Sequence, residues 1–221
     1  MAFGPKMSLS VGDLTIELAP LTKEAMGEFV VGMGQHSVTK YINRHLAPTL
    51  EDELEWFDKT RIDKTKIVWG IWAVKDNERV LIGNTALSEI ENKHIRQATS
   101  GSMIFRKEYW GIGIASHIHK ARTWYAFKHL GLHRIRSAVI NGNVASLKAL
   151  EKSGYSRVYV ERNTLFVDGE LRHQDNLECL NPASSFWSDW WHGERPTAQA
   201  LSARDRTREA MKWAEDNVNL A

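Results

Sequence analysis

The sequence predicts an α/β fold, a mixed sheet with helices on both faces, and three observations support this prediction. Alternating or β-branched segments, which are typical of strands, occur before and after segments with helical spacing. Helix start and stop signals separate the two kinds of segment. Strands and helices are interspersed along the whole chain of 221 residues, which fits one large domain, or one domain with an appendage.

The N-terminal half is predicted to contain two helices between strands. A short strand at 14–18 alternates and ends before Pro20. A helix follows Thr22, which can cap it, and Gly34 ends that helix. A second helix begins at Thr49, because the acidic residue three positions later completes a capping box. Buried or paired strands are then expected at 67–74, 80–90 and 100–105.

The C-terminal half is predicted to continue the same alternation of helices and strands. The long helix after the third of these strands ends at Gly131, and the next helix ends at Gly154, since glycine commonly follows a helix C-terminus. The predicted elements are a helix at 114–129, a strand at 134–140, a helix at 143–153, strands at 155–160 and 164–180 with a turn at 167–170 inside them, and a helix at 197–217.

Composition and charge exclude several classes of protein. The net charge is +2, which gives no strong field, so we expect no nucleic-acid partner. No run approaches the roughly 18 apolar residues of a membrane helix, and the N-terminus lacks a signal-peptide core, so we expect no membrane partner. Cys179 is the only cysteine. A disulfide framework or a cysteine-based zinc site is excluded, and a cytoplasmic setting is expected.

A glycine-rich segment precedes the long helix and reads E-Y-W-G-I-G-I-A-S-H, residues 108–117. The first backbone N–H groups of a helix have no internal partner, and the helix dipole adds positive potential there. Gly111, Gly113 and Ala115 keep side chains away from these groups, so a phosphate could bind. The spacing fits neither a Walker loop nor the Rossmann fingerprint. Taken alone, the segment fits a phosphate site or a tight packing turn equally well.

A second motif stands about 30 residues downstream and reads N-G-N-V-A-S-L-K-A-L-E-K-S-G-Y, residues 141–155. Asn143 and Ser146 fit a helix N-cap and the third residue of that helix. Together, the W-G-x-G-x-A segment and the N-x-x-S helix ending in E-K-x-G-Y resemble the general-control-type N-acetyltransferase (GNAT) superfamily. The E-Y-W-G-x-G-x-A form is similar to the branch that acetylates the N-termini of ribosomal proteins. Trp110 occupies a position where many members have Gln or Arg.

The resemblance implies a GNAT-like fold: a mixed, mostly antiparallel sheet of six to seven strands with helices on both faces. It implies a V-shaped splay between the strands at 100–105 and 134–140, where acetyl-CoA would bind. The GNAT domain would cover residues 12–180, and a Trp-rich extension would follow at 181–221. The implied acetyl-CoA contacts are the backbone of Met103 and Phe105 for pantetheine, the segment Trp110, Gly111, Ile112, Gly113, Ile114 and Ala115 for pyrophosphate, and Asn143 and Ser146.

The implied reaction is direct attack of a neutral primary amine on the thioester. Two groups that relatives often use for catalysis are absent, since their positions fall on Ser100 and Leu150. Ser146 is the candidate for general acid or sulfur ligand, and Glu89 and Glu91 are the candidate bases. The alternatives are a capping-region hydroxyl for the serine and solvated strand ends for the two glutamates.

The acceptor remains open in the sequence: a protein N-terminus, a lysine or a small amine would all fit. By resemblance, His36, Arg44 and Trp56 are the candidate acceptor-binding residues. No metal is expected, because residues two apart on a helix, such as His117 and His119, point to different sides. A CoA-binding module without strong catalysis, or an enzyme for another acyl group, stays open.

The C-terminal extension contains F-W-S-D-W-W-H, residues 186–192. This segment is too aromatic for a disordered linker, so we expect it to pack. Its own domain, a homodimer contact and a lid over the acceptor site are the three alternatives.

Overall fold

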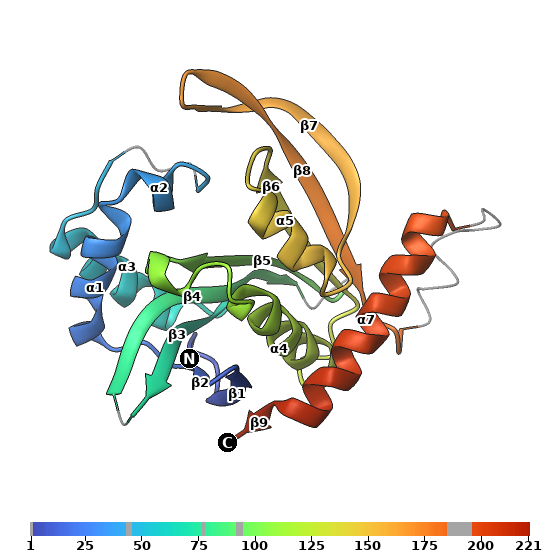
Figure 1. Ribbon diagram of the computed structural model, residues 1–221, viewed down its shortest axis with the longest axis horizontal. Helices are drawn as coiled ribbons and strands as arrows, with labels where there is room; N and C mark the ends of the chain where they lie inside the picture. The colour runs from blue at the N-terminus through green and yellow to red at the C-terminus, as the bar shows by residue number, and fades with distance from the viewer. Residues whose placement is uncertain (1, 43–45, 77, 92–94, 185–195) are drawn as a thin grey trace.

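The computed structural model describes residues 2–42, 46–76, 78–91, 95–184 and 196–221, which fold around one nine-stranded sheet (Figure 1). The order of strands is β7-β8-β6-β5-β4-β3-β2-β1-β9. Every neighbouring pair is antiparallel except β5 and β6, which run parallel. The strands are β1 (Met7–Val11), β2 (Leu14–Ala19), β3 (Ile67–Lys75), β4 (Glu78–Glu91), β5 (Gln97–Ile104), β6 (Arg134–Ile140), β7 (Ser156–Val167), β8 (Glu170–Leu180) and β9 (Asn219–Leu220).

The predicted mixed, mostly antiparallel sheet is confirmed, but the strand count of six to seven is wrong. The two additional strands are β1 and β9, which pair with each other at one edge of the sheet. Both are short, and β9 contributes only two pairs, Met7 with Leu220 and Ser8 with Asn219. The pairing of β9 with β1 joins distant parts of the chain, so local patterns carry no sign of it. β1 itself alternates and pairs with β2 across the Gly12–Asp13 turn, a local signal that the prediction missed. β1 precedes the predicted domain start at residue 12, and β9 follows its predicted end at 180.

The helices begin and end near the predicted residues. Thr49 caps its helix through a complete capping box with Asp52, and Thr197 accepts a hydrogen bond from the Ala200 amide at the start of the last helix. Thr22 makes no side-chain cap, and a 3₁₀ turn precedes the first α-helix instead. The helical elements are η1 (Lys23–Ala25), α1 (Met26–Met33), α2 (His36–Thr39), α3 (Leu50–Ile62), η2 (Lys107–Tyr109), α4 (Ile114–Lys128), α5 (Val144–Glu151) and α7 (Ala198–Asn217).

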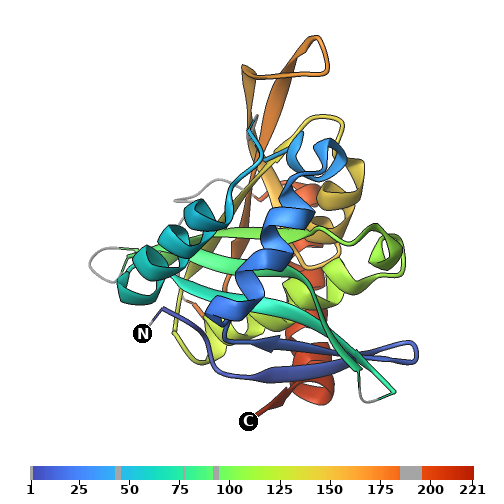
Figure 2. The same ribbon diagram turned by 90° about the vertical axis from the view of Figure 1, so that its left-hand side faces the viewer.

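Helices cover both faces of the sheet, as predicted. On one face, α1 and α3 pack through Phe29 and Phe57 into a cluster that includes Phe105. On the other face, α4 and α5 pack through residues such as Ile118 and Leu150 against β5 and β6. Figure 2 shows α1 in front of the sheet and α7 behind it. The central strands, β5 and β6 among them, therefore lie between two buried apolar layers, which hold these strands in place.

The C-terminal helix α7 packs against α4 and the turn after α5. Gly154 ends α5 with a φ of 90°, and a Cβ atom there would lie 2.0 Å from Thr207 Oγ1. Thr207 is buried and donates to the Gly154 carbonyl at 3.3 Å. Nearer the other end of α7, the Trp213 ring lies 4.9 Å from the His117 ring on α4. Among the described helices, none is both long enough and apolar enough to cross a membrane.

Candidate active site

An opening forms in the sheet where its two parallel strands part. β5 and β6 pair over three residues only, the last pair being Thr99 with Arg136. Beyond this point β5 stays paired with β4, while β6 stays paired with β8. From Ser100 onward, one edge of β5 therefore faces no strand, and its backbone can pair with a ligand. This opening is the V-shaped splay that the resemblance implied.

The backbone of β5 faces β4 at Phe105 and, by alternation, at Met103. The Phe105 amide donates to Ile82 O at 2.9 Å, and neighbouring residues of an antiparallel ladder alternate in direction. The Phe105 ring is buried and meets the Phe29 ring edge-on at 5.3 Å. The predicted pantetheine contacts at Met103 and Phe105 do not fit this geometry, because the register with β4 already uses these backbone groups.

The alternate residues of β5 direct their backbone into the opening. The Ser100 carbonyl accepts a hydrogen bond from Ser137 Oγ of β6 at 3.4 Å. The Ile104 carbonyl accepts one from the indole nitrogen of Trp110 at 2.8 Å. By the same alternation, Ser102 turns its amide and carbonyl to the open side. Ser100, Ser102 and Ile104 thus form the edge along which an extended ligand could lie.

The glycine segment at the end of β5 has the backbone geometry that an anion site needs. Gly111 and Gly113 have φ values of 79° and 93°, a region that other residues rarely adopt. Gly113 is the N-cap of α4, and none of the described side chains caps this helix. The first amides of α4 are therefore available to a phosphate. Ile114 is buried and fixes the helix start on the core, while Trp110 and Ile112 are exposed.

The start of α5 lies on the other side of the opening, after β6. Asn143 Oδ1 accepts a hydrogen bond from the Ser146 amide at 3.3 Å, as an N-cap does. Within the described part of the chain, neither the Asn143 Nδ2 group nor the Ser146 hydroxyl makes a protein hydrogen bond. Both groups are therefore available to a ligand. The catalytic and cofactor roles of these two residues remain predictions.

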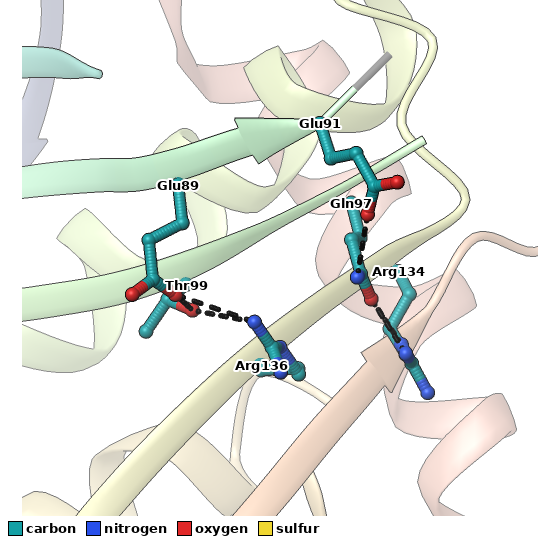
Figure 3. Close-up of polar contacts among 6 residues, drawn as sticks. All are labelled: Glu89, Glu91, Gln97, Thr99, Arg134 and Arg136. Atoms are coloured by element: carbon teal, nitrogen blue, oxygen red, sulfur yellow. Dashed lines mark hydrogen bonds and ion pairs between the residues drawn. The ribbon is translucent and has the colours of Figure 1, made fainter. Parts of the chain in front are cut away.

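Glu89 lies at the point where β5 and β6 part (Figure 3). A bulge in β4 gives Glu89 a positive φ of 53°. Its carboxylate accepts a hydrogen bond from Thr99 Oγ1 at 2.6 Å and lies 3.3 Å from Arg136 Nη2. Thr99 and Arg136 form the last β5–β6 pair, so Glu89 stands at the apex of the opening.

Glu91 lies in a separate group, one step farther from the opening, as Figure 3 shows. Its Oε2 accepts a hydrogen bond from Gln97 Nε2 at 3.0 Å, and Gln97 Oε1 accepts in turn from Arg134 Nε at 2.9 Å. Gln97 and Arg134 are the first β5–β6 pair. Of the two candidate bases, Glu89 is therefore the one close to the apex.

A cavity of about 260 Å³ lies between the α1–α2 region and the tip of the β7–β8 hairpin. Met33, on its wall, belongs to the same apolar cluster as Phe105. Val167, on the opposite wall, packs with Ile140 at the end of β6. The cavity thus bridges the β5 and β6 sides of the opening. It is lined by Met33, Gly34, His36, Thr39, Lys40, Leu46, Ala47, Phe166, Val167 and Asp168.

Asp168 joins the hairpin tip to α2 at this cavity. Its carboxylate oxygens lie 2.7 Å from His36 Nε2 and 3.4 Å from Lys40 Nζ. In Figures 1 and 2 the hairpin arches over so that its tip approaches α2. The hydrogen bond from His36, and then the contact with Lys40, hold the pKa of the Asp168 carboxyl below its usual range. Asp168 is therefore ionised and already paired with basic groups.

The three predicted acceptor residues have different places. His36 lines the cavity. Trp56 packs against Phe29, with ring centroids 5.8 Å apart, in the core between α1 and α3. Arg44 lies outside the described residues. The sequence analysis did not single out Lys40 or Asp168, which also line the cavity. For Asp168 a signal was present, since the predicted turn at 167–170 places an acidic residue at the tip of a hairpin.

No metal site accompanies this arrangement in the described part of the chain. No group of three or more His, Cys, Asp or Glu side chains could hold a metal ion there. His119 is buried, and burial first, then the neighbouring Arg122, holds its pKa well below the usual range. The site therefore offers backbone donors, hydroxyls and carboxylates.

A family model described as "Acetyltransferase (GNAT) domain" matches residues 15–156. The chain belongs to the GNAT acetyltransferase family. The match spans more than half of the chain and includes both motifs and the opening between them. It confirms the prediction of a GNAT N-acetyltransferase domain with a CoA-binding site.

Two proteins of Bacillus subtilis (strain 168) are similar in sequence. The "Probable N-acetyltransferase YjcK" is 31% identical over 114 residues, which are 52% of this chain and 61% of that protein. The "Uncharacterized N-acetyltransferase YoaA" is 30% identical over 135 residues, 60% of this chain and 74% of that protein. The similarity thus covers less than two thirds of the length of YjcK.

Solved structures with the same fold extend the comparison. Mycobacterium smegmatis RimJ, in complex with CoA-disulfide, has a TM-score of 0.69 at 17% identity and covers 98% of each chain. The Vibrio cholerae spermidine N-acetyltransferase, in complex with CoA and spermine, has a TM-score of 0.67 at 21% identity and covers 76% of this chain and 96% of that one. These likenesses confirm the GNAT fold.

Proposed function

We propose that this protein transfers the acetyl group of acetyl-CoA to a primary amine, by direct attack while both substrates are bound. The observation that carries this proposal is the end of β5–β6 pairing at Thr99 and Arg136. It leaves an open strand edge that leads to the glycine segment before α4. A long, thin ligand with a phosphate at one end fits this path.

In this proposal, the chain holds acetyl-CoA mainly by its backbone. The amides of Gly111 to Ala115 bind the pyrophosphate. The edge formed by Ser100, Ser102 and Ile104 pairs with pantetheine as an added strand would. Asn143 Nδ2 donates to a pantetheine carbonyl from the other side. The thioester then lies toward the apex, near Glu89 and the Ser102 amide.

The acceptor is proposed to enter through the cavity beneath the hairpin tip. Its described walls combine apolar side chains, Met33, Phe166 and Val167 among them, with a few polar ones. Its carboxylate, Asp168, is already paired with His36 and Lys40. A polyamine, which needs several free carboxylates, matches this lining poorly. A single amine carried on an apolar group, such as the N-terminus of a peptide, matches it better.

The chemistry requires a base, a donor to the carbonyl oxygen and a proton for the leaving thiolate. We assign Glu89 as the base that takes the ammonium proton, directly or through a water molecule. The Ser102 amide donates to the thioester oxygen. Ser146 Oγ donates to the sulfur as the C–S bond breaks. Each group is positioned by the backbone or by hydrogen bonds to neighbouring strands.

The test is release of CoA from acetyl-CoA in the presence of an acceptor panel, with acetylated product identified by mass spectrometry. The panel contains peptides with free N-termini, the same peptides with a blocked N-terminus and one lysine, and spermidine. Turnover of the free N-terminal peptides, above the blocked ones and spermidine, is expected. Acetyl-CoA binding without turnover of any amine would overturn the proposal and favour a CoA-binding module.

A further inference from the structure

Arg122 on α4 is fully buried and, among the described residues, has no acidic partner. Its side chain is 0% exposed, and it forms no ion pair within the described part of the chain. Its nearest titratable neighbour is His119, whose Nδ1 lies 3.0 Å from Arg122 Nη2. The lowered pKa of His119 keeps that ring neutral. A buried guanidinium without a carboxylate is strongly disfavoured unless other groups compensate it.

The compensating groups belong to β5 and its neighbour β4. Arg122 Nη1 donates to Gly101 O at 2.9 Å, to Ser102 Oγ at 2.8 Å and to Thr85 Oγ1 at 2.7 Å. Thr85 Oγ1 also donates to Gly101 O at 3.1 Å. The Gly101 carbonyl therefore accepts two hydrogen bonds from side chains, one of them from a charged group, while Gly101 also pairs with Ala86 of β4. Charge-assisted bonds are roughly twice as strong as neutral ones.

The peptide that Arg122 binds is the one that faces the thioester in the proposed complex. In a trans peptide, the carbonyl of Gly101 and the amide of Ser102 point in opposite directions. Because the carbonyl points to Arg122 and β4, the amide points into the opening. The buried charge fixes this peptide in one orientation and polarises its N–H group. Its own positive potential also reaches the opening through a water-poor core.

We propose that Arg122 is a positioning residue for acyl transfer, which orients the Gly101–Ser102 peptide and stabilises the negative charge that develops on the thioester oxygen. In the step concerned, the amine nitrogen bonds to the acyl carbon and the carbonyl π electrons move to the oxygen. The C–S bond then breaks and the carbonyl re-forms, while the nitrogen loses its extra proton and the thiolate takes one, which leaves a neutral amide and the CoA thiol. The inference rests on the proposed function, since it requires acetyl-CoA in the opening.

The first measurement is the carbonyl stretch of bound [1-¹³C]acetyl-CoA, recorded by difference infrared spectroscopy. In the wild type, the stretch is expected at lower frequency than in free acetyl-CoA, because the oxygen faces a polarised donor. Thr85→Val with Arg122→Met removes the charge and replaces the buried polar pair by apolar groups, so folding is favoured. In this double variant the stretch should move back toward the free value. Arg122→Lys, which keeps the charge, should remain closer to the wild type.

The second measurement is turnover with the acceptor that the panel identifies. Removal of the charge should lower kcat about tenfold, below the roughly 10²-fold loss typical of a direct oxyanion donor. The dissociation constant of acetyl-CoA, measured by calorimetry, should change by less than about threefold, since the phosphate contacts remain. Thr85→Val alone keeps the Arg122 charge and removes the hydrogen bonds that the Thr85 hydroxyl makes with Arg122, Ser102 and Gly101. It serves as the matched control, with a smaller shift of the stretch.

The outcomes separate this inference from the proposed function. An unchanged stretch and an unchanged kcat in the folded double variant would overturn the role of Arg122 while leaving acetyl transfer intact. Failure of the wild type to bind acetyl-CoA in the calorimeter would overturn the proposed function itself. Thermal unfolding of each variant shows whether it is folded. If the double variant does not fold, Thr85→Val carries the test, and a stretch identical to that of the wild type in this variant would also overturn the inference.

Discussion

Trp110 Nε1 donates a hydrogen bond to the carbonyl of Ile104 at 2.8 Å. This bond closes the short segment between the end of β5 and the glycines into a fixed loop. By the resemblance, Trp110 occupies the position where many family members have Gln or Arg, and the residue is 43% exposed. Its indole therefore acts on the phosphate site by bracing the backbone.

Replacement of Trp110 by Phe should weaken acetyl-CoA binding about fivefold, the equivalent of one hydrogen bond of about 1 kcal/mol. Calorimetry measures the change. Trp124→Phe is the matched control, because Trp124 lies near the far end of α4 and its indole nitrogen has no hydrogen-bond partner among the described residues. Equal affinities for the two variants would contradict the bracing role.

Replacement of Gly113 by Ala should nearly abolish acetyl-CoA binding. At a φ of 93° a side chain adds roughly 1–2 kcal/mol of strain, and relief of that strain moves the amides at the start of α4. Gly12→Ala is the control, since Gly12 also has a positive φ and open space around it, in the β1–β2 turn. Both variants should lose thermal stability, and only the first should lose affinity. Loss of affinity in neither variant would exclude the phosphate site.

Replacement of Glu89 by Gln should lower kcat by roughly 10²-fold or more, as expected for loss of a general base. The acetyl-CoA dissociation constant should not change. Glu91→Gln provides the comparison on the same strand, and its kcat should stay within about twofold of the wild type, because Glu91 lies with Gln97 away from the apex. Similar rates for both variants would remove Glu89 from the mechanism.

Cys179 should not react with thiol reagents while the protein is folded. Burial raises the pKa of its thiol to about 12, so the thiolate that reacts is absent at neutral pH. Titration with a chromogenic disulfide reagent should detect no thiol in the native protein and one thiol per chain in denaturant. Reaction of the native protein would show that the packing around Cys179 opens. The same property makes the reagent suitable for measuring CoA release.

Local sequence signals were sufficient to predict the helix starts and the glycine turns around the proposed acetyl-CoA site. The capping box at Thr49 and the cap at Asn143 formed where the sequence predicted them, because a cap depends on residues within one helical turn. The two positive φ values in the glycine segment follow from the same local physics. The resemblance then supplied the splay, which no local pattern encodes.

The features that could not be predicted from the sequence depend on contacts between distant segments. The direction of the backbone at Met103 and Phe105 is fixed by the register with β4, which local patterns do not reveal. Asp168 meets His36 across 132 residues of chain. Arg122 had one signal, since it follows Ile114 and Ile118 at intervals of four on the apolar side of α4.

The contact between Gly154 and Thr207 has a consequence for sequence variation. The glycine of the E-K-S-G-Y motif turns the chain after α5, and in this protein it also makes room for α7. A Cβ atom at 154 would meet both the side chain and the backbone of Thr207, at 2.0 Å and 2.7 Å. Even a smaller residue at 207 would not relieve the backbone contact. Relatives that dock a C-terminal helix in this place should therefore keep glycine at this position, and exceptions should occur only together with loss or displacement of the helix.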